Sequence, residues 1–295
     1  MVAVGFNTKT GKYLPDRIEY LRKTRQRHSW PLEVLAKTEA RPHSAPYIVS
    51  IQIQTEEGQS LHYCAGSIIN ENWILTAAHC LDSKEVVENS ILVAGCHDIH
   101  STRDDDSVQR RTIEFFIKHE LFLGGVNPYD IALIYTRTPF KFSEYVQPVE
   151  LPKQGDLAHG AATLYGWGNI STTCIPLFPS LLQATDMPIL DMELCEGVLG
   201  DVGMCLHETN LCTGPLDGGN SICTADSGGP LVQRSVYFGR TTIVGIVSWG
   251  KMPCGQVNAP SVFVKVASFI DWIQNTIKTA EQSFKCQQFS KDIQI

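Results

Sequence analysis

The chain has 295 residues, and its 43% hydrophobic and 19% charged residues are ordinary proportions for a packed globular protein. A formal net charge of -7 argues against nucleic acid as a partner, because neutralising phosphates requires a basic face. Ten cysteines without a CxxC pair argue against a zinc ribbon and favour disulfide bonds, and hence an oxidising compartment.

Residues 1–33 differ in composition from the rest of the chain. They carry seven basic and three acidic side chains, a net charge of +4, and no cysteine. This composition predicts a solvated basic extension, with a pro-segment or a docking arm as the alternative. The start of the chain lacks the apolar core of a signal peptide. No apolar run in the sequence is long enough to span a bilayer.

From about residue 45, short apolar runs alternate with clusters of Gly, Pro, Asn and Asp. The runs lie at 47–51, 73–75, 91–93, 131–134, 162–165, 231–232, 243–247 and 262–264. Many short strands with frequent turn signals predict a β-sandwich or β-barrel. Between Phe269 and Ile277, apolar residues recur at three- and four-residue spacing, which predicts a helix near 268–278. Residues 280–295 are predicted to form a polar tail.

Three further segments supply a candidate nucleophile, a candidate general base and a candidate carboxylate that orients the base. Ser227 lies between an acid and two glycines in the stretch 226–230, where the chain can turn sharply and expose a hydroxyl. A serine hydroxyl needs a base to remove its proton, and His79 is the candidate. A histidine base needs a carboxylate to fix its tautomer, and Asp130 leads directly into an apolar strand. The chain order His, Asp, Ser matches one known arrangement of such a triad.

The segments TAAHC, DIAL, DSGGP and SWG follow one another in this order. With them, the chain from about Val34 to Ile277 resembles the trypsin/chymotrypsin family of serine proteases. The resemblance implies an all-β fold of two antiparallel six-stranded β-barrels with a C-terminal helix, and a protease domain at 34–279 between the basic extension and the polar tail. It implies Ser227 as nucleophile, His79 as general base and then acid, and Asp130 as the group that orients the imidazole. It implies no cofactor and no metal.

The resemblance also implies disulfide pairings. Cys64–Cys80 would pin the loop that bears His79, Cys195–Cys212 would lie in the second barrel, and Cys223–Cys254 would brace the specificity pocket. Four cysteines are then left over. Cys96 and Cys174 would lie in neighbouring loops and are expected to pair, which leaves Cys205 and Cys286 as the last pair.

Substrate binding follows from the same resemblance. Ser248, Trp249 and Gly250 match the segment that pairs with the substrate backbone as an extra strand, and Ser248 should also touch Asp130. Ser221 takes the place of the aspartate at the base of the primary pocket of trypsins, so a basic side chain would be buried there without a partner. Ser261 replaces a glycine on the wall and narrows the slot. We therefore expect a preference for Leu, Met, Phe or Tyr.

Two positions depart from the family pattern. Ala225 replaces the glycine whose N–H forms the oxyanion hole together with that of Ser227, at a cost of about 1–2 kcal/mol if a positive φ is needed. At the activation site, family members are cut to release an ammonium that pairs with the aspartate matched here by Asp226. The matching start is Val34, it follows Glu33 rather than a basic residue, and the family's glycines are missing.

These features predict a secreted serine endopeptidase, made as a zymogen, that hydrolyses peptide bonds after apolar or aromatic residues through an acyl-enzyme. The alternative is a catalytically weak or inactive homologue that acts as a binding module. Expected partners are protein or peptide substrates, protease inhibitors and an activating protease, and the protein is expected to be a monomer. Asn169 begins a glycosylation sequon. The acidic run 104–106 is interpreted as a solvated loop, with a Ca²⁺ site as the alternative.

Overall fold

A computed structural model gives the fold of residues 6–7, 12–13, 35–55, 58–100, 107–173, 175–200, 203–235 and 239–293, with the backbone alone for the first two ranges and for 285–293. The two short N-terminal ranges form an antiparallel ribbon, β1 (Phe6–Asn7) with β2 (Lys12–Tyr13). The rest of the basic extension lies outside the described residues, and so do Val34, Cys174 and the acidic run 104–106.

The first half of the described domain is one curled antiparallel sheet. Its order is β8-β7-β4-β5-β6-β10-β9. These strands are β4 (Ile48–Gln54), β5 (Ser60–Ile68), β6 (Trp73–Thr76), β7 (Ser90–Ala94), β8 (Gln109–Thr112), β9 (Phe115–Lys118) and β10 (Ala132–Tyr135). The two edge strands, β8 and β9, are separated by only two residues, so they are the halves of one bent strand that joins the two edges of the sheet.

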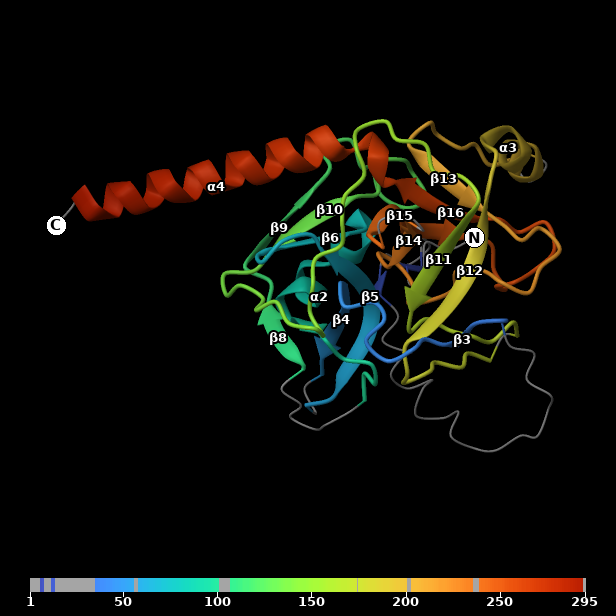
Figure 1. Cartoon of the computed structure of the whole chain (residues 1–295), viewed down its shortest axis with the longest axis horizontal. Helices are drawn as coiled ribbons and strands as arrows, with labels where there is room; N and C mark the ends of the chain where they lie inside the picture. Colours follow the sequence, from blue (N-terminus) through green and yellow to red (C-terminus); the bar gives the residue numbers. More distant parts are fainter. Residues whose placement is uncertain are drawn as a thin grey trace.

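The second half is a closed six-stranded barrel. Its order is β11-β14-β15-β16-β13-β12, and a β11–β12 pairing closes it. These strands are β11 (Ala161–Gly166), β12 (Gln183–Leu190), β13 (Asn210–Thr213), β14 (Pro230–Arg234), β15 (Thr241–Gly250) and β16 (Ser261–Lys265). The short strand β3 (Thr38–Glu39), which is not one of the six barrel strands, pairs antiparallel with β12. Figure 1 shows the two units side by side, and they confirm the predicted two-barrel fold.

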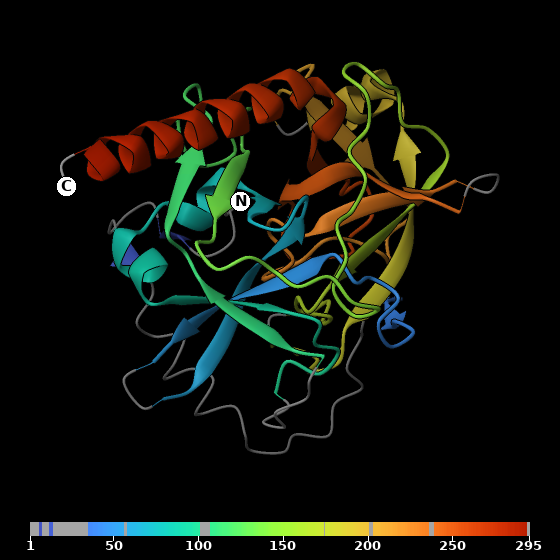
Figure 2. The same ribbon diagram turned by 60° about the vertical axis from the view of Figure 1, so that its left-hand side comes forward.

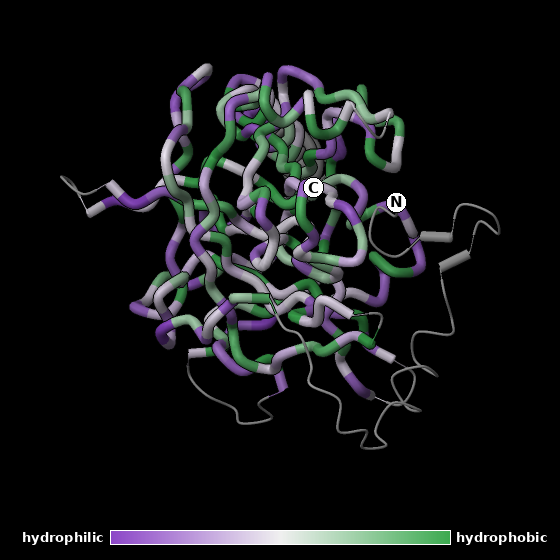
Figure 3. The backbone as a smooth tube through the Cα atoms, turned by 90° about the vertical axis from the view of Figure 1, so that its right-hand side faces the viewer, coloured by the Kyte–Doolittle hydropathy of each residue, from purple (hydrophilic) through white to green (hydrophobic). Residues whose placement is uncertain are grey.

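Each unit encloses its own apolar interior. Trp73, Ile74 and Leu133 are fully buried in the first, and Leu231 and Phe263 are fully buried in the second. Burial alternates along β11 and β12, as expected for strands with one face toward a core and the other toward solvent. In Figure 3, hydrophobic stretches run through the interior while polar ones lie mainly on the outer turns.

Two 3₁₀ helices and three α-helices complete the described residues. They are η1 (Ala78–Leu81), α2 (Lys84–Glu88), α3 (Met192–Gly200), η2 (Val266–Ser268) and α4 (Ile270–Ile293). The predicted C-terminal helix is present but continues well beyond residue 278. No Gly or Pro interrupts the sequence after Ile277. The Phe284 ring also packs on Phe115 and Tyr135 of the first sheet, with ring centroids 5.3 and 5.0 Å away.

Three of the five expected disulfides are present: Cys64–Cys80, Cys195–Cys212 and Cys223–Cys254. The other two expected pairs are not, because Cys96 and Cys205 are free thiols. Burial raises the pKa of Cys96 to about 12, so this thiol stays protonated and unreactive. Cys205 follows α3, whereas the far half of α4, which carries Cys286, runs away from α3 (Figures 1 and 2).

Candidate active site

His79 and Asp130 are brought together by the pairing of two neighbouring strands. In the β6–β10 ladder, Thr76 at the end of β6 lies opposite Ala132 at the start of β10. The residues just after β6 and just before β10 therefore emerge at the same end of the sheet. His79 Nδ1 lies 2.7 Å from Asp130 Oδ2, and the His79 backbone N–H donates to Oδ1 at 2.9 Å. The predicted base and its orienting carboxylate are thus in direct contact.

A tight turn aims the Asp130 carboxylate at the ring. Tyr129 has a φ of 65°, uncommon for a bulky residue, and the Ile131 N–H donates back to the Tyr129 carbonyl at 2.7 Å. The Tyr129 ring stacks on His119 with centroids 4.9 Å apart, which holds the turn in place. Ser248 donates its hydroxyl to Asp130 Oδ2 at 2.6 Å, as predicted. A register shift in the β15–β16 ladder between Val247 and Trp249 leaves Ser248 out of the regular pairing.

The charge state of His79 reflects two opposing influences. Burial lowers its pKa, but the charge and hydrogen bond of Asp130, with a smaller effect from Asp82, more than offset this, so the pKa is raised. Asp130 is 1% exposed and therefore acts on the ring with little screening by water. Because Nδ1 faces the carboxylate, it carries the proton in the neutral ring, and Nε2 is left as the basic nitrogen.

Ser227 is anchored through its backbone beside the same end of the first sheet. The Ala65 N–H donates to the Ser227 carbonyl at 2.8 Å. The next residue, Gly228, has a φ of 74°, and a Cβ there would lie 2.3 Å from Thr76 Oγ1, so only glycine fits. Cys64, adjacent to Ala65, is bonded to Cys80, adjacent to His79. The disulfide therefore links the strand that holds Ser227 to the turn that holds His79.

The two atoms expected to react are both buried and unpaired. In the described part of the chain, neither Ser227 Oγ nor His79 Nε2 makes a hydrogen bond. Such catalytic contacts are often loose without substrate and tighten when it binds. The Asp130–His79 contact of the predicted triad is therefore formed in this structure, whereas the His79–Ser227 hydrogen bond is not.

Ala225, the residue predicted to donate one N–H group to the oxyanion hole, has the positive φ that favours glycine. Ala225 is buried and has a φ of 72°, so the backbone keeps a positive φ at this position although the residue is alanine. Its carbonyl accepts a bond from His62 Nε2 at 2.9 Å, and His62 Nδ1 lies 2.8 Å from Ser50 Oγ. Within the described residues, the N–H groups of Ala225 and Ser227 donate to no backbone carbonyl. Sequence reasoning missed His62, which no local motif marks.

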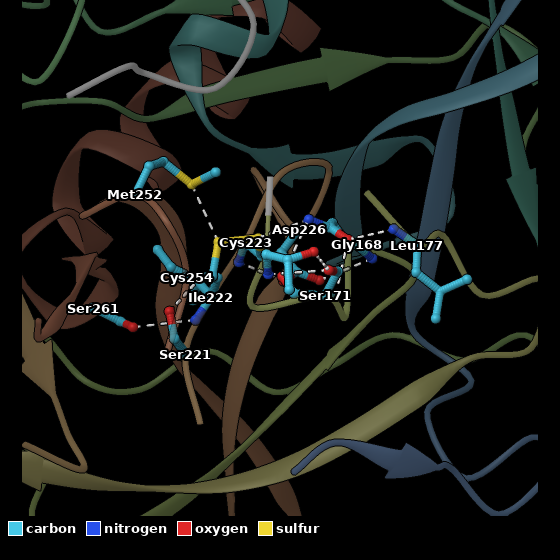
Figure 4. Close-up of a disulfide and its surroundings, with 12 residues drawn as sticks. Gly168, Ser171, Leu177, Ser221, Ile222, Cys223, Asp226, Met252, Cys254 and Ser261 are labelled. Carbon is cyan, nitrogen blue, oxygen red and sulfur yellow. Dashed lines mark hydrogen bonds between the residues drawn. A yellow bond between two sulfur atoms is a disulfide. The ribbon is translucent and has the colours of Figure 1, made fainter. Parts of the chain in front are cut away.

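The primary pocket is small and apolar. A cavity of ≈ 10 Å³, about the room that one water molecule needs, lies beside Ser227. It is lined by Ile222, Cys223, Ser227, Val247, Ser248, Gly250, Lys251 and Met252. A Cβ on Gly250 would lie 3.2 Å from the Ile222 side chain, so Ile222 fills the space across from Gly250. Figure 4 shows Met252 next to Cys254, with its sulfur 3.2 Å from the Cys254 sulfur.

Two of the predicted pocket residues lie behind the wall rather than on it. Ser261 accepts the Ile222 N–H at 3.1 Å, and Ser221 donates to the Ile222 carbonyl at 2.5 Å (Figure 4). Both serines are buried and support the backbone of Ile222, the residue that narrows the cavity. Trp249 is buried in a separate cluster with Leu199 of α3. Ser248 and Gly250 line the cavity, and their pairing with a substrate backbone stays a prediction.

Asp226 is the most completely enclosed acid of the site. Its Oδ1 accepts the Gly168 N–H at 3.0 Å and its Oδ2 accepts the Cys223 N–H at 2.8 Å. Figure 4 shows Asp226 between the Cys223–Cys254 disulfide and Gly168. The Lys37 ammonium forms an ion pair with Oδ2. The sequence had predicted that a new amine at Val34, which lies outside the described residues, would take this place.

The predicted glycosylation of Asn169 does not fit the structure. The side chain is 3% exposed, and its Oδ1 accepts the N–H groups of Ser171 at 2.9 Å and Leu177 at 2.7 Å. The amide nitrogen lies 3.5 Å from Cys223 Sγ. A glycan on this nitrogen has no room in the folded chain, and the buried Asn169 instead caps the turn that leads to Leu177.

Two features of the described residues bear on metal ions and on membranes. The one group of three metal-ligand side chains close enough to share an ion there is Cys64, His79 and Cys80, and its two cysteines are bonded to each other. Among the helices of that same part of the chain, we find none that combines the length and the apolarity needed to cross a membrane.

Comparison with known proteins agrees with this geometry. The family model described as Trypsin matches residues 34–273. The chain is 37% identical over 257 residues to Lectizyme from Glossina austeni, covering 83% of this chain and 86% of that protein. It is 34% identical to Trypsin II-P29 from Gallus gallus, covering 80% and 85%, and 32% identical to a snake venom serine protease homolog from Bothrops jararacussu, covering 77% and 81%. The chain therefore belongs to the trypsin family of serine proteases.

Proposed function

We propose that this chain is a secreted endopeptidase that cleaves after apolar residues through an acyl-enzyme on Ser227. The observation that carries the proposal is the chain of hydrogen bonds Ser248–Asp130–His79, with lengths of 2.6 and 2.7 Å, which leaves His79 Nε2 as a basic nitrogen without a partner among the described residues. A histidine held in one tautomer by a buried carboxylate is the arrangement that activates a serine.

The reaction begins with a proton transfer. Ser227 Oγ attacks the substrate carbonyl carbon while His79 Nε2 takes the hydroxyl proton, and Asp130 stabilises the imidazolium that forms. The N–H groups of Ala225 and Ser227 stabilise the oxyanion. His79 then donates its proton to the leaving amine as the C–N bond breaks. Water, deprotonated by His79, hydrolyses the ester and releases the acid and the free hydroxyl.

The proposed specificity rests on the lack of a carboxylate in the lining of the cavity and on Ile222. No residue that lines the cavity carries a carboxylate, and Ser221 behind the wall offers none, so a buried Arg or Lys side chain would remain unpaired. Ile222, held by Ser261, restricts the length and width of an apolar side chain. Among Leu, Met, Phe and Tyr, we therefore expect Leu and Met to be preferred over the two rings.

The proposed extracellular location rests on the three disulfides, which persist in oxidising compartments. Partners that fit such an enzyme are protein substrates and protease inhibitors.

A second function, a non-catalytic binding module, is favoured by one observation. The cavity has room for about one water molecule, so a substrate side chain enters only if Ile222 or Met252 moves. One relative in the comparison is itself named a homolog of a protease.

Profiling with a peptide library tests the first function. We expect cleavage after Leu and Met that disappears in Ser227→Ala. A dominant preference for Arg or Lys would refute the pocket assignment, and no cleavage by either the uncut or the processed chain would favour the binding module.

A further inference from the structure

Lys37 and Asp226 form an ion pair inside the protein. Their side chains are 2% and 0% exposed, and the two residues are 189 positions apart in sequence. A buried carboxylate without a cation is strongly unfavourable, so Asp226 depends on Lys37 for its charge balance. In the described part of the chain, this is the one ion pair in which both side chains are fully enclosed and neither is a histidine.

The segment that carries Lys37 is fixed along its length. The Leu35 N–H donates to Ile170 O at 2.7 Å, and the Ala36 N–H donates to Gly219 O at 3.3 Å. The Leu35 side chain is buried against the Cys223–Cys254 disulfide. Directly after Lys37, β3 pairs with β12. Lys37 therefore reaches Asp226 from a docked segment rather than from a loose loop.

Asp226 lies between the two proposed oxyanion donors. Its neighbours in the chain are Ala225 and Ser227, and its carboxylate fixes the backbone by accepting N–H groups from Gly168 and Cys223. While Asp226 is held by Lys37, the Ala225 carbonyl is held by His62 at 2.9 Å. The ion pair is thus coupled through one residue to the conformation of the oxyanion hole.

We propose that Lys37 is a positioning residue whose side-chain ammonium orders Asp226 and the oxyanion hole in the uncut chain, so that competence does not require release of an amine at Val34. The inference rests on the proposed function, because it assigns the regulation of that same site. Because the Lys37 ammonium already balances the charge of the Asp226 carboxylate, a second cation is not required there. Glu33, rather than a basic residue, precedes Val34, so the sequence lacks the usual signal for cleavage at this point. A chain that needs no new amine at Val34 has no need of that signal.

The test uses the full-length chain, shown to be uncut by intact mass and N-terminal sequencing, and a fluorophosphonate as the probe of Ser227. Wild-type uncut protein should label. Lys37→Met keeps most of the apolar stem and loses the ammonium, so labelling of the uncut chain should slow on the order of 100-fold, the typical effect of one lost oxyanion donor. Lys84→Met is the matched control, because Lys84 is 88% exposed, and it should label at the wild-type rate.

A second variant distinguishes loss of the Lys37 charge from a failure of the protein to fold. Lys37→Ala should recover labelling when propylammonium, which matches the three carbons and the ammonium removed, is added, and not with propan-1-ol, which has the same stem without the charge. Hydrogen exchange gives a readout independent of chemistry: the amides of Gly168 and Cys223 should exchange faster in Lys37→Met than in wild type.

Two results overturn the inference. Wild-type protein that labels only after cleavage would show that a new amine is required, and Lys37→Met that labels at the wild-type rate when uncut would show that the ammonium is not. If neither the cut nor the uncut wild type labels, the proposed function fails. In that case, equal exchange of the two amides in wild type and Lys37→Met would overturn the role of Lys37 as well.

Discussion

Ile222 should control which side chain the pocket accepts. Its side chain lies across from Gly250, at 3.2 Å from where a Cβ on that glycine would be, and the cavity beside it holds ≈ 10 Å³. Ile222→Ala removes three carbon atoms from this wall. One methylene in an apolar pocket is worth about 1–3 kcal/mol, or roughly 10–200-fold in discrimination. The ratio of kcat/KM for a Phe substrate to that for a Leu substrate should therefore rise at least about 10-fold.

The same substitution has a cost in stability. Ile222 is 4% exposed, so the three lost carbons remove about 2.4 kcal/mol at 0.8 kcal/mol each, which lowers Tm by about 5–10 °C in a domain of this size. Val244→Ala is the control, because Val244 belongs to the same apolar cluster but does not line the cavity. It should lower Tm without changing the Phe-to-Leu ratio. An unchanged ratio in Ile222→Ala, with folded protein, would refute the reasoning.

Three further predictions concern the reacting groups. Ser227→Ala should abolish turnover while leaving Tm within a few degrees of wild type, and wild-type turnover in that variant would refute the nucleophile. Ala225→Gly should raise kcat by less than about 10-fold, because the alanine already adopts the required φ, and a gain near 100-fold would instead mean that the donor is flipped. Activity requires neutral His79, so it should fall as pH decreases through a pKa raised above the ordinary 6.5, and Asp130→Asn should shift that acid limb downward in a pH profile of kcat/KM.

The sequence was sufficient for the features that local chemistry dictates. A serine nucleophile needs a base and an oriented acid, and the segments around His79, Asp130 and Ser227 carry recognisable neighbours for those roles. The bond from Ser248 to Asp130 followed from the same resemblance and is present at 2.6 Å. Short apolar runs between turn residues predicted a β-sandwich or β-barrel because strand spacing is a local property, and the resemblance to the protease family supplied the two barrels.

The features that the sequence did not reveal are contacts between distant segments. His62 reaches the Ala225 carbonyl across 163 positions, and Lys37 reaches Asp226 across 189. Nothing in the sequence marked Lys37 as a buried residue, since a lysine in a polar stretch is usually exposed. Ile222 gave no signal because an isoleucine beside a cysteine is an ordinary buried residue. The length of α4 was underestimated because its polar half is held by packing of Phe284 on the first sheet.

The most direct test of the central claim is mass-spectrometric mapping of a fluorophosphonate adduct on the purified chain. We expect a single adduct on the peptide that contains Ser227, absent from Ser227→Ala and strongly reduced in Asp130→Asn. No adduct on either the uncut or the processed protein, or an adduct on a different serine, would contradict it.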